Sequence, residues 1–85
     1  MKKPVKKPFQ YFGRAVTCFR LERGMKRKEL AKAAEMSYSH LASIEVGAKY
    51  PSYQILGKLA EALKVSPADL RCRAQHIETN FGHWP

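Results

Sequence analysis

Hydrophobic residues recur every three to four positions along most of the chain, which is the spacing of one face of an α-helix. The first such run covers residues 10–23 and ends at Gly24. A second run covers residues 26–34, and a third begins after the N-cap residue Ser37 and ends at Gly47. The positions predicted to face a core are Phe12, Val16 and Phe19, with Ala15 and Cys18 beside them; Leu30, Ala31 and Ala34; and Leu41 and Ile44.

Two further helices are predicted after the turn at Pro51. Ser52 is a suitable N-cap for the fourth helix, which contains Gly57 as a weak position. Its apolar stripe is Tyr53, Leu56, Leu59, Ala60 and Leu63. The segment 66–69, Ser-Pro-Ala-Asp, resembles a capping box with proline at the first helical position, so a fifth short helix begins there. Alternation of β-branched residues is absent from the sequence, and the predicted fold class is all-α with five helices.

The two ends of the chain differ from this pattern. Residues 1–9 are predicted to form a flexible basic arm, because prolines and charged residues dominate there and few apolar side chains are available to be buried. Its lysines are Lys2, Lys3, Lys6 and Lys7. Residues 10–70 form the predicted domain. Residues 71–85 show no clear period, and Ile77, Phe81 and Trp84 are expected to cover an apolar patch on this domain or on a second copy.

The net charge of the chain indicates which kind of partner it attracts. The 85 residues include 16 Lys and Arg against 7 Asp and Glu, a net charge of +9. The excess lies in the arm and the first half of the chain, and a positive field of this kind attracts polyanions.

Several classes of protein are excluded by composition. The chain has no run of ~18 apolar residues that would suit a membrane span, and no secretory signal pattern, so a cytoplasmic protein is expected. Two cysteines are too few for a disulfide framework, and Cys72 with His76 lacks zinc-site spacing, so neither metal nor cofactor is expected. The histidines, including His40 and His83, lack a matched carboxylate constellation, and no nucleophile motif is present; an enzyme is not expected.

Two short helices joined by the tight connection 34–36 point to a specific kind of binding. A helix-turn-helix of this size sets its helices at a steep angle, and the second helix then protrudes. With Leu41 and Ile44 inward, the outer side of that helix carries residues that are small or aromatic and uncharged, where a solvated surface would carry Lys or Glu. They are Tyr38, Ser39, Ala42, Ser43 and Val46. An α-helix fits the major groove of DNA, so this face suits base edges.

Four motifs follow one another between Phe12 and Leu70: F-G-x-x-V-x-x-F-R, E-L-A-K, M-S-x-S-x-L-x-x-I-E-x-G and P-S-Y-x-x-L-x-x-L-A-x-A-L-x-V-S. The ordered set resembles the Cro/repressor-type helix-turn-helix domain of the XRE-like family of phage repressors and bacterial regulators. The resemblance implies a compact five-helix, lambda-repressor-like bundle in which the second and third helices form the helix-turn-helix and residues 37–46 read DNA.

The resemblance also implies roles for individual residues. Arg20 and Glu45 correspond to a buried pair that ties the first helix to the end of the recognition helix. The positions expected to read bases are Tyr38, Ser39, Ala42 and Ser43. The positions expected to contact phosphates are Arg20, Lys26, Arg27, Ser37, Val46 through its backbone, and Lys49.

The sequence departs from the family pattern at three positions. Glu35 stands where the turn usually has glycine, and Lys26 stands where serine or asparagine usually caps the second helix, so we expect an altered turn and a weakly capped helix end. Arg27 replaces a glutamine that usually contacts phosphate; arginine still binds phosphate through two N–H groups. Because the reading face lacks Gln, Asn and Arg, we expect shape readout to add to specificity.

These observations predict a sequence-directed regulator of transcription that binds double-stranded DNA, as a homodimer on a pseudo-palindromic site. One alternative stays open. A protein of the same fold can act as an antitoxin or an accessory module that binds a protein partner, with DNA binding secondary.

Overall fold

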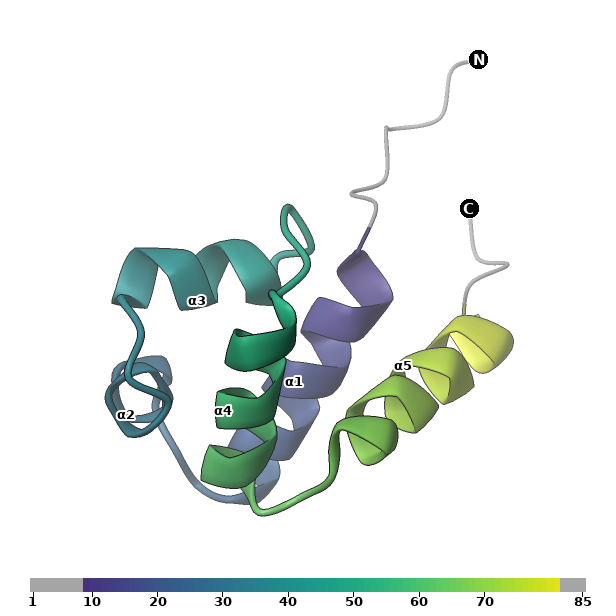
Figure 1. Cartoon of the computed structure of the whole chain (residues 1–85). Helices are drawn as coiled ribbons and strands as arrows, with labels where there is room; N and C mark the ends of the chain where they lie inside the picture. Colours follow the sequence, from purple (N-terminus) through teal and green to yellow (C-terminus); the bar gives the residue numbers. More distant parts are fainter. Residues whose placement is uncertain (1–8, 82–85) are drawn as a thin grey trace.

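This computed structural model describes residues 9–81 of the chain, which contain five helices (Figure 1). They are α1 (Gln10–Glu22), α2 (Arg27–Ala33), α3 (Tyr38–Glu45), α4 (Tyr53–Leu63) and α5 (Pro67–Phe81). No strand occurs in this part of the chain, so the predicted all-α fold class is confirmed. No helix within the described range is long and apolar enough to span a membrane.

The predicted N-caps of α3 and α4 are present. The Ser37 hydroxyl accepts a hydrogen bond from the backbone N–H of His40 at 3.0 Å. The Ser52 hydroxyl accepts one from Ile55 at 3.2 Å. Each bond satisfies a backbone donor that the first turn of a helix would otherwise leave unpaired, which is why these two helices begin where the sequence predicts.

The capping box of α5 is also formed. The Ser66 N–H donates to Asp69 Oδ2 at 2.9 Å, and the Asp69 N–H donates to the Ser66 hydroxyl at 3.1 Å. The bond from the Ser66 backbone is the main reason that the pKa of Asp69 lies below its usual value. The expectation that α5 would be short is wrong: the helix continues to Phe81, through positions where the sequence shows no clear period.

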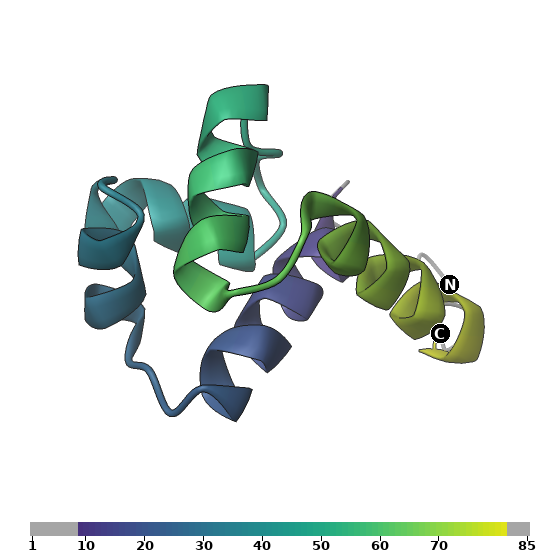
Figure 2. The same ribbon diagram turned by 60° about the horizontal axis from the view of Figure 1, so that its bottom comes forward.

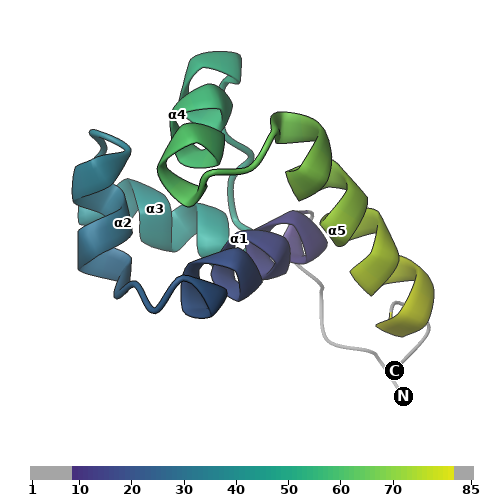
Figure 3. The same ribbon diagram turned by 90° about the horizontal axis from the view of Figure 1, so that it is seen from below.

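α1 runs between α3 on one side and α5 on the other and packs against both (Figures 1 and 3). α2 packs against α3 and α4, and the C-terminal half of α5 projects away from these three helices (Figure 2). The hydrophobic core that joins the helices is Phe12, Val16, Phe19, Leu30, Ala31, Ala34, Leu41, Ile44, Leu56, Leu59, Ala60, Leu63 and Leu70. These are mainly the predicted core positions.

Two residues predicted to make apolar contacts, Tyr53 and Ile77, differ in their burial. Tyr53 is 91% exposed, because it is the first residue of α4 and lies before the turn that meets the core, so its assignment to the core stripe is wrong. Ile77 is buried, which places the described part of the tail on the domain itself. The side chain of Phe81 and the whole of Trp84 lie outside the described residues, as does the predicted arm before Phe9.

A close helix crossing decides where α3 lies relative to α1. Gly13 is buried in α1, and a Cβ atom at this position would lie 2.3 Å from the backbone oxygen of Ile44 and 2.4 Å from that of Glu45. Real Cβ atoms essentially never approach backbone atoms this closely. The absence of a side chain at Gly13 therefore lets α1 pack directly on the last turn of α3.

Gly57→Ala and Gly13→Ala should have opposite effects on the free energy of unfolding. Gly57 lies exposed within α4, and a Cβ atom there meets nothing within 4 Å. Alanine at this position should stabilise the protein by about 0.5–1 kcal/mol through its higher helix propensity. Gly13→Ala should destabilise the protein, because the backbone of α3 must move. Urea unfolding of both variants checks the prediction, and equal effects at the two sites would contradict it.

Candidate nucleic-acid interface

A buried carboxylate at the end of α3 receives hydrogen bonds from α1. The Glu45 side chain is 1% exposed and that of Arg20 is 11% exposed. Arg20 Nε donates to Glu45 Oε2 at 2.9 Å, and Nη2 donates to Oε1 at 3.2 Å. The remaining nitrogen, Nη1, donates to the backbone oxygen of Met25 at 2.9 Å. The ion pair expected between Arg20 and Glu45 is therefore present, and it joins α1 to the last residue of α3.

The Arg20 guanidinium is consequently directed into the protein. All three of its nitrogens have partners inside the fold, and the residue is 9% exposed. These bonds use three of its five N–H groups, and little of its surface is left for a ligand. The contact of Arg20 with a DNA phosphate stays a prediction, and its observed role is to join α1 to α3.

Glu45 also binds α2. Arg27 Nε donates to Glu45 Oε1 at 3.1 Å, and the Thr17 hydroxyl donates to the same oxygen at 3.0 Å. The guanidinium carbon of Arg27 lies 5.9 Å from the centre of the Tyr38 ring, at the start of α3. Burial disfavours the charged form of Arg27, but the hydrogen bond to Glu45 and its negative charge outweigh this, so the pKa of Arg27 lies above its usual value. Arg27 is thus held as a cation between α2 and both ends of α3.

The outer side of α3 is free of the other helices in the described chain (Figure 1). Tyr38 is 53% exposed, and Ser39 and Val46 are exposed as well. Ala42 and Ser43 are half-buried. On the opposite side Leu41 and Ile44 are fully buried. In Figure 1 α2 is seen nearly end-on while α3 lies across the view, so the two helices cross steeply, as the sequence predicts.

The turn between α2 and α3 accommodates Glu35. This residue has φ = 57°, a left-handed conformation that glycine adopts more easily. The backbone N–H of Met36 donates to the oxygen of Ala31 at 2.9 Å, and Lys58 Nζ lies 3.3 Å from Glu35 Oε1. The expected change in the turn is therefore absent from the backbone: Glu35 takes the conformation that a glycine would take and pairs with α4.

The start of α2 is capped in a way that was not expected. Lys26 provides no side-chain cap, but its backbone N–H donates to Glu29 Oε1 at 2.7 Å. Lys26 itself is exposed, as are Ser37 and Lys49. Three of the residues predicted to contact phosphates are thus exposed: Ser37 and Lys49 next to the two ends of α3, and Lys26 at the start of α2.

The segment after α3 is held close to the start of α1. The backbone N–H groups of Ala48 and Lys49 donate to the oxygen of Ser43 at 2.9 and 3.3 Å. The N–H of Phe9 donates to the oxygen of Gly47 at 3.0 Å. The described chain therefore begins beside the C-terminal end of α3. The predicted arm contacts Lys2, Lys3, Lys6 and Lys7 lie outside the described residues.

A family model described as helix-turn-helix matches residues 19–70, more than half of the chain. This range includes α2, the turn and α3. The chain belongs to the XRE-like helix-turn-helix family. A search of curated proteins found no significant match.

Solved structures of regulators share the fold. The clp gene regulator ClgR from Corynebacterium glutamicum is 28% identical with a TM-score of 0.82, and the match covers 95% of this chain and 84% of that one. SinR, the master regulator for biofilm formation solved in complex with DNA, is 36% identical with a TM-score of 0.68 over 71% and 97% of the two chains. The restriction-modification controller protein C.AhdI from Aeromonas hydrophila is 28% identical with a TM-score of 0.70 over 72% and 92%.

The link between Glu45, Arg27 and Tyr38 was missed from sequence. Arg27 and Tyr38 are separated by the turn, and only the fold brings the guanidinium over the ring. A helical-wheel analysis treats each helix alone and gives no signal for such a contact. Among residues 9–81, no group of three or more His, Cys, Asp or Glu side chains is arranged to hold a metal ion.

Glu45→Gln should destabilise the protein by about 3–5 kcal/mol, because it leaves the Arg20 guanidinium buried without a matching charge. Glu22→Gln is the matched control, since Glu22 also pairs with an arginine, Arg73, at 2.9 Å but on the surface. The control should change stability far less, because water screens that pair. Urea unfolding of both variants measures the difference. Equal, small effects would show that the buried pair does not stabilise the bundle.

Proposed function

We propose that this protein is a sequence-directed, double-stranded-DNA-binding regulator of transcription that acts in the cytoplasm as a homodimer and places α3 in the major groove. The observation that carries the proposal is the outer face of α3. Tyr38, Ser39 and Val46 are exposed and uncharged on a helix whose other side is fixed in the core. Such a face can approach base edges without first removing a shell of water from charged side chains. SinR, which is 36% identical, was solved in complex with DNA.

Cations near the two ends of α3 support this placement. Lys26 and Arg27 lie at the start of α2, where the Arg27 guanidinium reaches Tyr38 at the N-terminal end of α3, and Lys49 follows the C-terminal end of α3. Because Glu45 and Tyr38 already position the Arg27 guanidinium, its remaining N–H groups would meet a phosphate with little loss of side-chain freedom. Ser37 and the backbone of Val46 would make the neutral phosphate contacts. Tyr38, Ser39, Ala42 and Ser43 would read the bases.

The position of Phe9 supports a contribution from the basic arm. Residues 2–8 are joined to the chain beside the end of α3, where Phe9 binds Gly47. Seven residues span at most ~25 Å when extended, which is enough to reach along the phosphates next to the recognition helix. We therefore propose that Lys2, Lys3, Lys6 and Lys7 contact DNA from this side.

Ser39→Ala combined with Ser43→Ala should change the sequence that the protein selects from random duplexes, because it removes two hydroxyl groups from the reading face. Stability should stay within about 0.5 kcal/mol, since neither side chain is fully buried. Selection with the wild-type protein should yield a motif with half-site symmetry. An unchanged motif in the double variant would contradict the assignment of α3, and the absence of DNA binding in dilute buffer would contradict the function.

Deletion of residues 2–8 should lower the salt dependence of DNA binding. Each phosphate contact contributes about 0.9 to the slope of log K against log salt concentration, so loss of the four lysines should lower the slope by up to ~3.6. Replacing the four lysines by glutamine in the full-length chain is the control, because it removes the charge while keeping the arm. A slope that both variants leave unchanged would remove the arm from the interface.

A further inference from the structure

The outer face of α3 offers little of the hydrogen bonding that usually distinguishes one base from another. In the major groove, Arg, Lys, Asn and Gln identify guanine or adenine through paired hydrogen bonds, and none of these residue types occurs in Tyr38–Glu45. Glu45 is buried in its ion pairs, and His40 is half-buried. Ser39 and Ser43 can bond to more than one kind of base edge and so discriminate little. Apolar contact with the methyl group of thymine is the other form of direct readout.

Tyr38 and Ala42 provide an apolar surface for such a contact. The two residues are four positions apart, so their side chains are neighbours on the helix. A helical side chain is directed toward the N-terminus of its helix, which brings the Ala42 methyl group toward the Tyr38 ring. Tyr38 is 53% exposed and lies at the N-terminal end of α3, the end through which recognition helices mainly contact bases. A methyl group in the major groove would thus meet a ring and a second methyl group.

The fold holds the Tyr38 ring in place. The Arg27 guanidinium lies over it, 5.9 Å from the ring centre, within range of a cation–π interaction. Arg27 Nε is itself bound to Glu45 Oε1 at 3.1 Å, and the same carboxylate is bound by Arg20. The ring is therefore positioned before DNA arrives, and contact with a methyl group costs little side-chain freedom.

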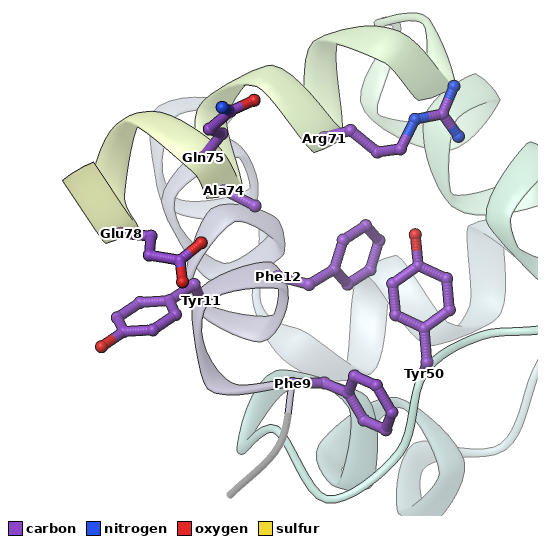
Figure 4. Close-up of a pocket in the computed structure, with 8 residues that line it drawn as sticks. All are labelled: Phe9, Tyr11, Phe12, Tyr50, Arg71, Ala74, Gln75 and Glu78. Carbon is purple, nitrogen blue, oxygen red and sulfur yellow. The ribbon is translucent and has the colours of Figure 1, made fainter. Parts of the chain in front are cut away.

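The C-terminal end of α3 is fixed as well. A Cβ atom at Gly47 would lie 2.5 Å from the Cα atom of Gln10, so the turn after α3 packs directly on the start of α1. Tyr50, in the segment that follows, packs beside the rings of Phe9 and Phe12, with ring centres 5.4 and 4.7 Å away (Figure 4). With both ends of α3 held, the depth at which its outer face meets a duplex is decided by the fold.

We propose that Tyr38 and Ala42 form a binding surface for the 5-methyl group of thymine, so that the protein selects half-sites with thymine at the position facing the N-terminal end of α3. The Tyr38 ring contributes its apolar surface, and its hydroxyl group is not needed for this contact. The inference rests on the proposed function, since it names the chemical group that α3 recognises in DNA.

Uracil provides the test, because it pairs as thymine does and lacks only the 5-methyl group. The full-length protein first selects its motif from random duplexes that contain thymine. Uracil then replaces each thymine of one half-site in turn, and the dissociation constant of each duplex is measured. At the thymine that faces Tyr38, uracil should weaken binding about fourfold, the value of one buried methyl group.

Variants of the ring show whether this effect belongs to Tyr38. The ratio of the dissociation constants for the uracil and thymine duplexes should stay at about four in Tyr38→Phe and fall to about one in Tyr38→Ala. Ala42→Gly should also lower the ratio. Tyr53→Ala is the matched control and should keep the ratio, because Tyr53 is likewise the exposed first residue of a helix but belongs to α4. Each ratio compares two duplexes on one protein, so a general loss of affinity or stability does not change it.

The possible results separate the inference from the proposed function. A uracil effect that is kept in Tyr38→Phe and lost in Tyr38→Ala supports the methyl-binding surface. A motif without a fixed thymine, a wild-type ratio of about one at every thymine, or a ratio that Tyr38→Ala leaves unchanged overturns the inference while the proposed function stands. Absence of DNA binding is a different result, which contradicts the proposed function and the inference together.

Discussion

The buried carboxylate of Glu45 is the interaction on which the rest of the structure depends. It receives hydrogen bonds from Arg20 and Thr17 on α1 and from Arg27 on α2, so one side chain joins three helices. A charge in this environment is stable only when it is paired and hydrogen-bonded, and two arginines together more than balance it. The position of α3 relative to the bundle is therefore decided at its last residue, by a group that points away from the proposed DNA surface.

The hydrogen bonds to Glu45 connect the core to the candidate nucleic-acid interface. All three nitrogens of Arg20 bind groups inside the fold. Arg27, by contrast, uses one nitrogen for Glu45 and lies over the Tyr38 ring at the start of α3. Arg27 is thus positioned by the fold but is only half-buried. α1 packs against two helices: the side that carries Gly13 contacts α3, and its other side contacts α5.

The departures from the family pattern are compensated locally. Glu35 adopts the left-handed conformation of a turn glycine and pairs with Lys58, and Glu29 accepts a hydrogen bond from the backbone N–H of Lys26. The Glu29 bond satisfies the N–H of Lys26 itself, whereas a serine or asparagine at position 26 would accept from an N–H in the first turn of α2. α2, the turn and α3 still form a helix-turn-helix with these residues in place.

Local interactions explain what the sequence by itself determined. The number of helices, the limits of α1 to α3, the start of α4, the serine caps and most core positions follow from hydrophobic period and capping, because each depends on residues within one or two turns. The exposure of the outer face of α3 followed from the same period. The length of α5, the exposure of Tyr53, the inward direction of Arg20 and the grouping of Arg27 with Glu45 and Tyr38 were decided only by the tertiary structure. Each of these depends on which helix packs against which, and a periodic pattern within one segment carries no information about its neighbours in space.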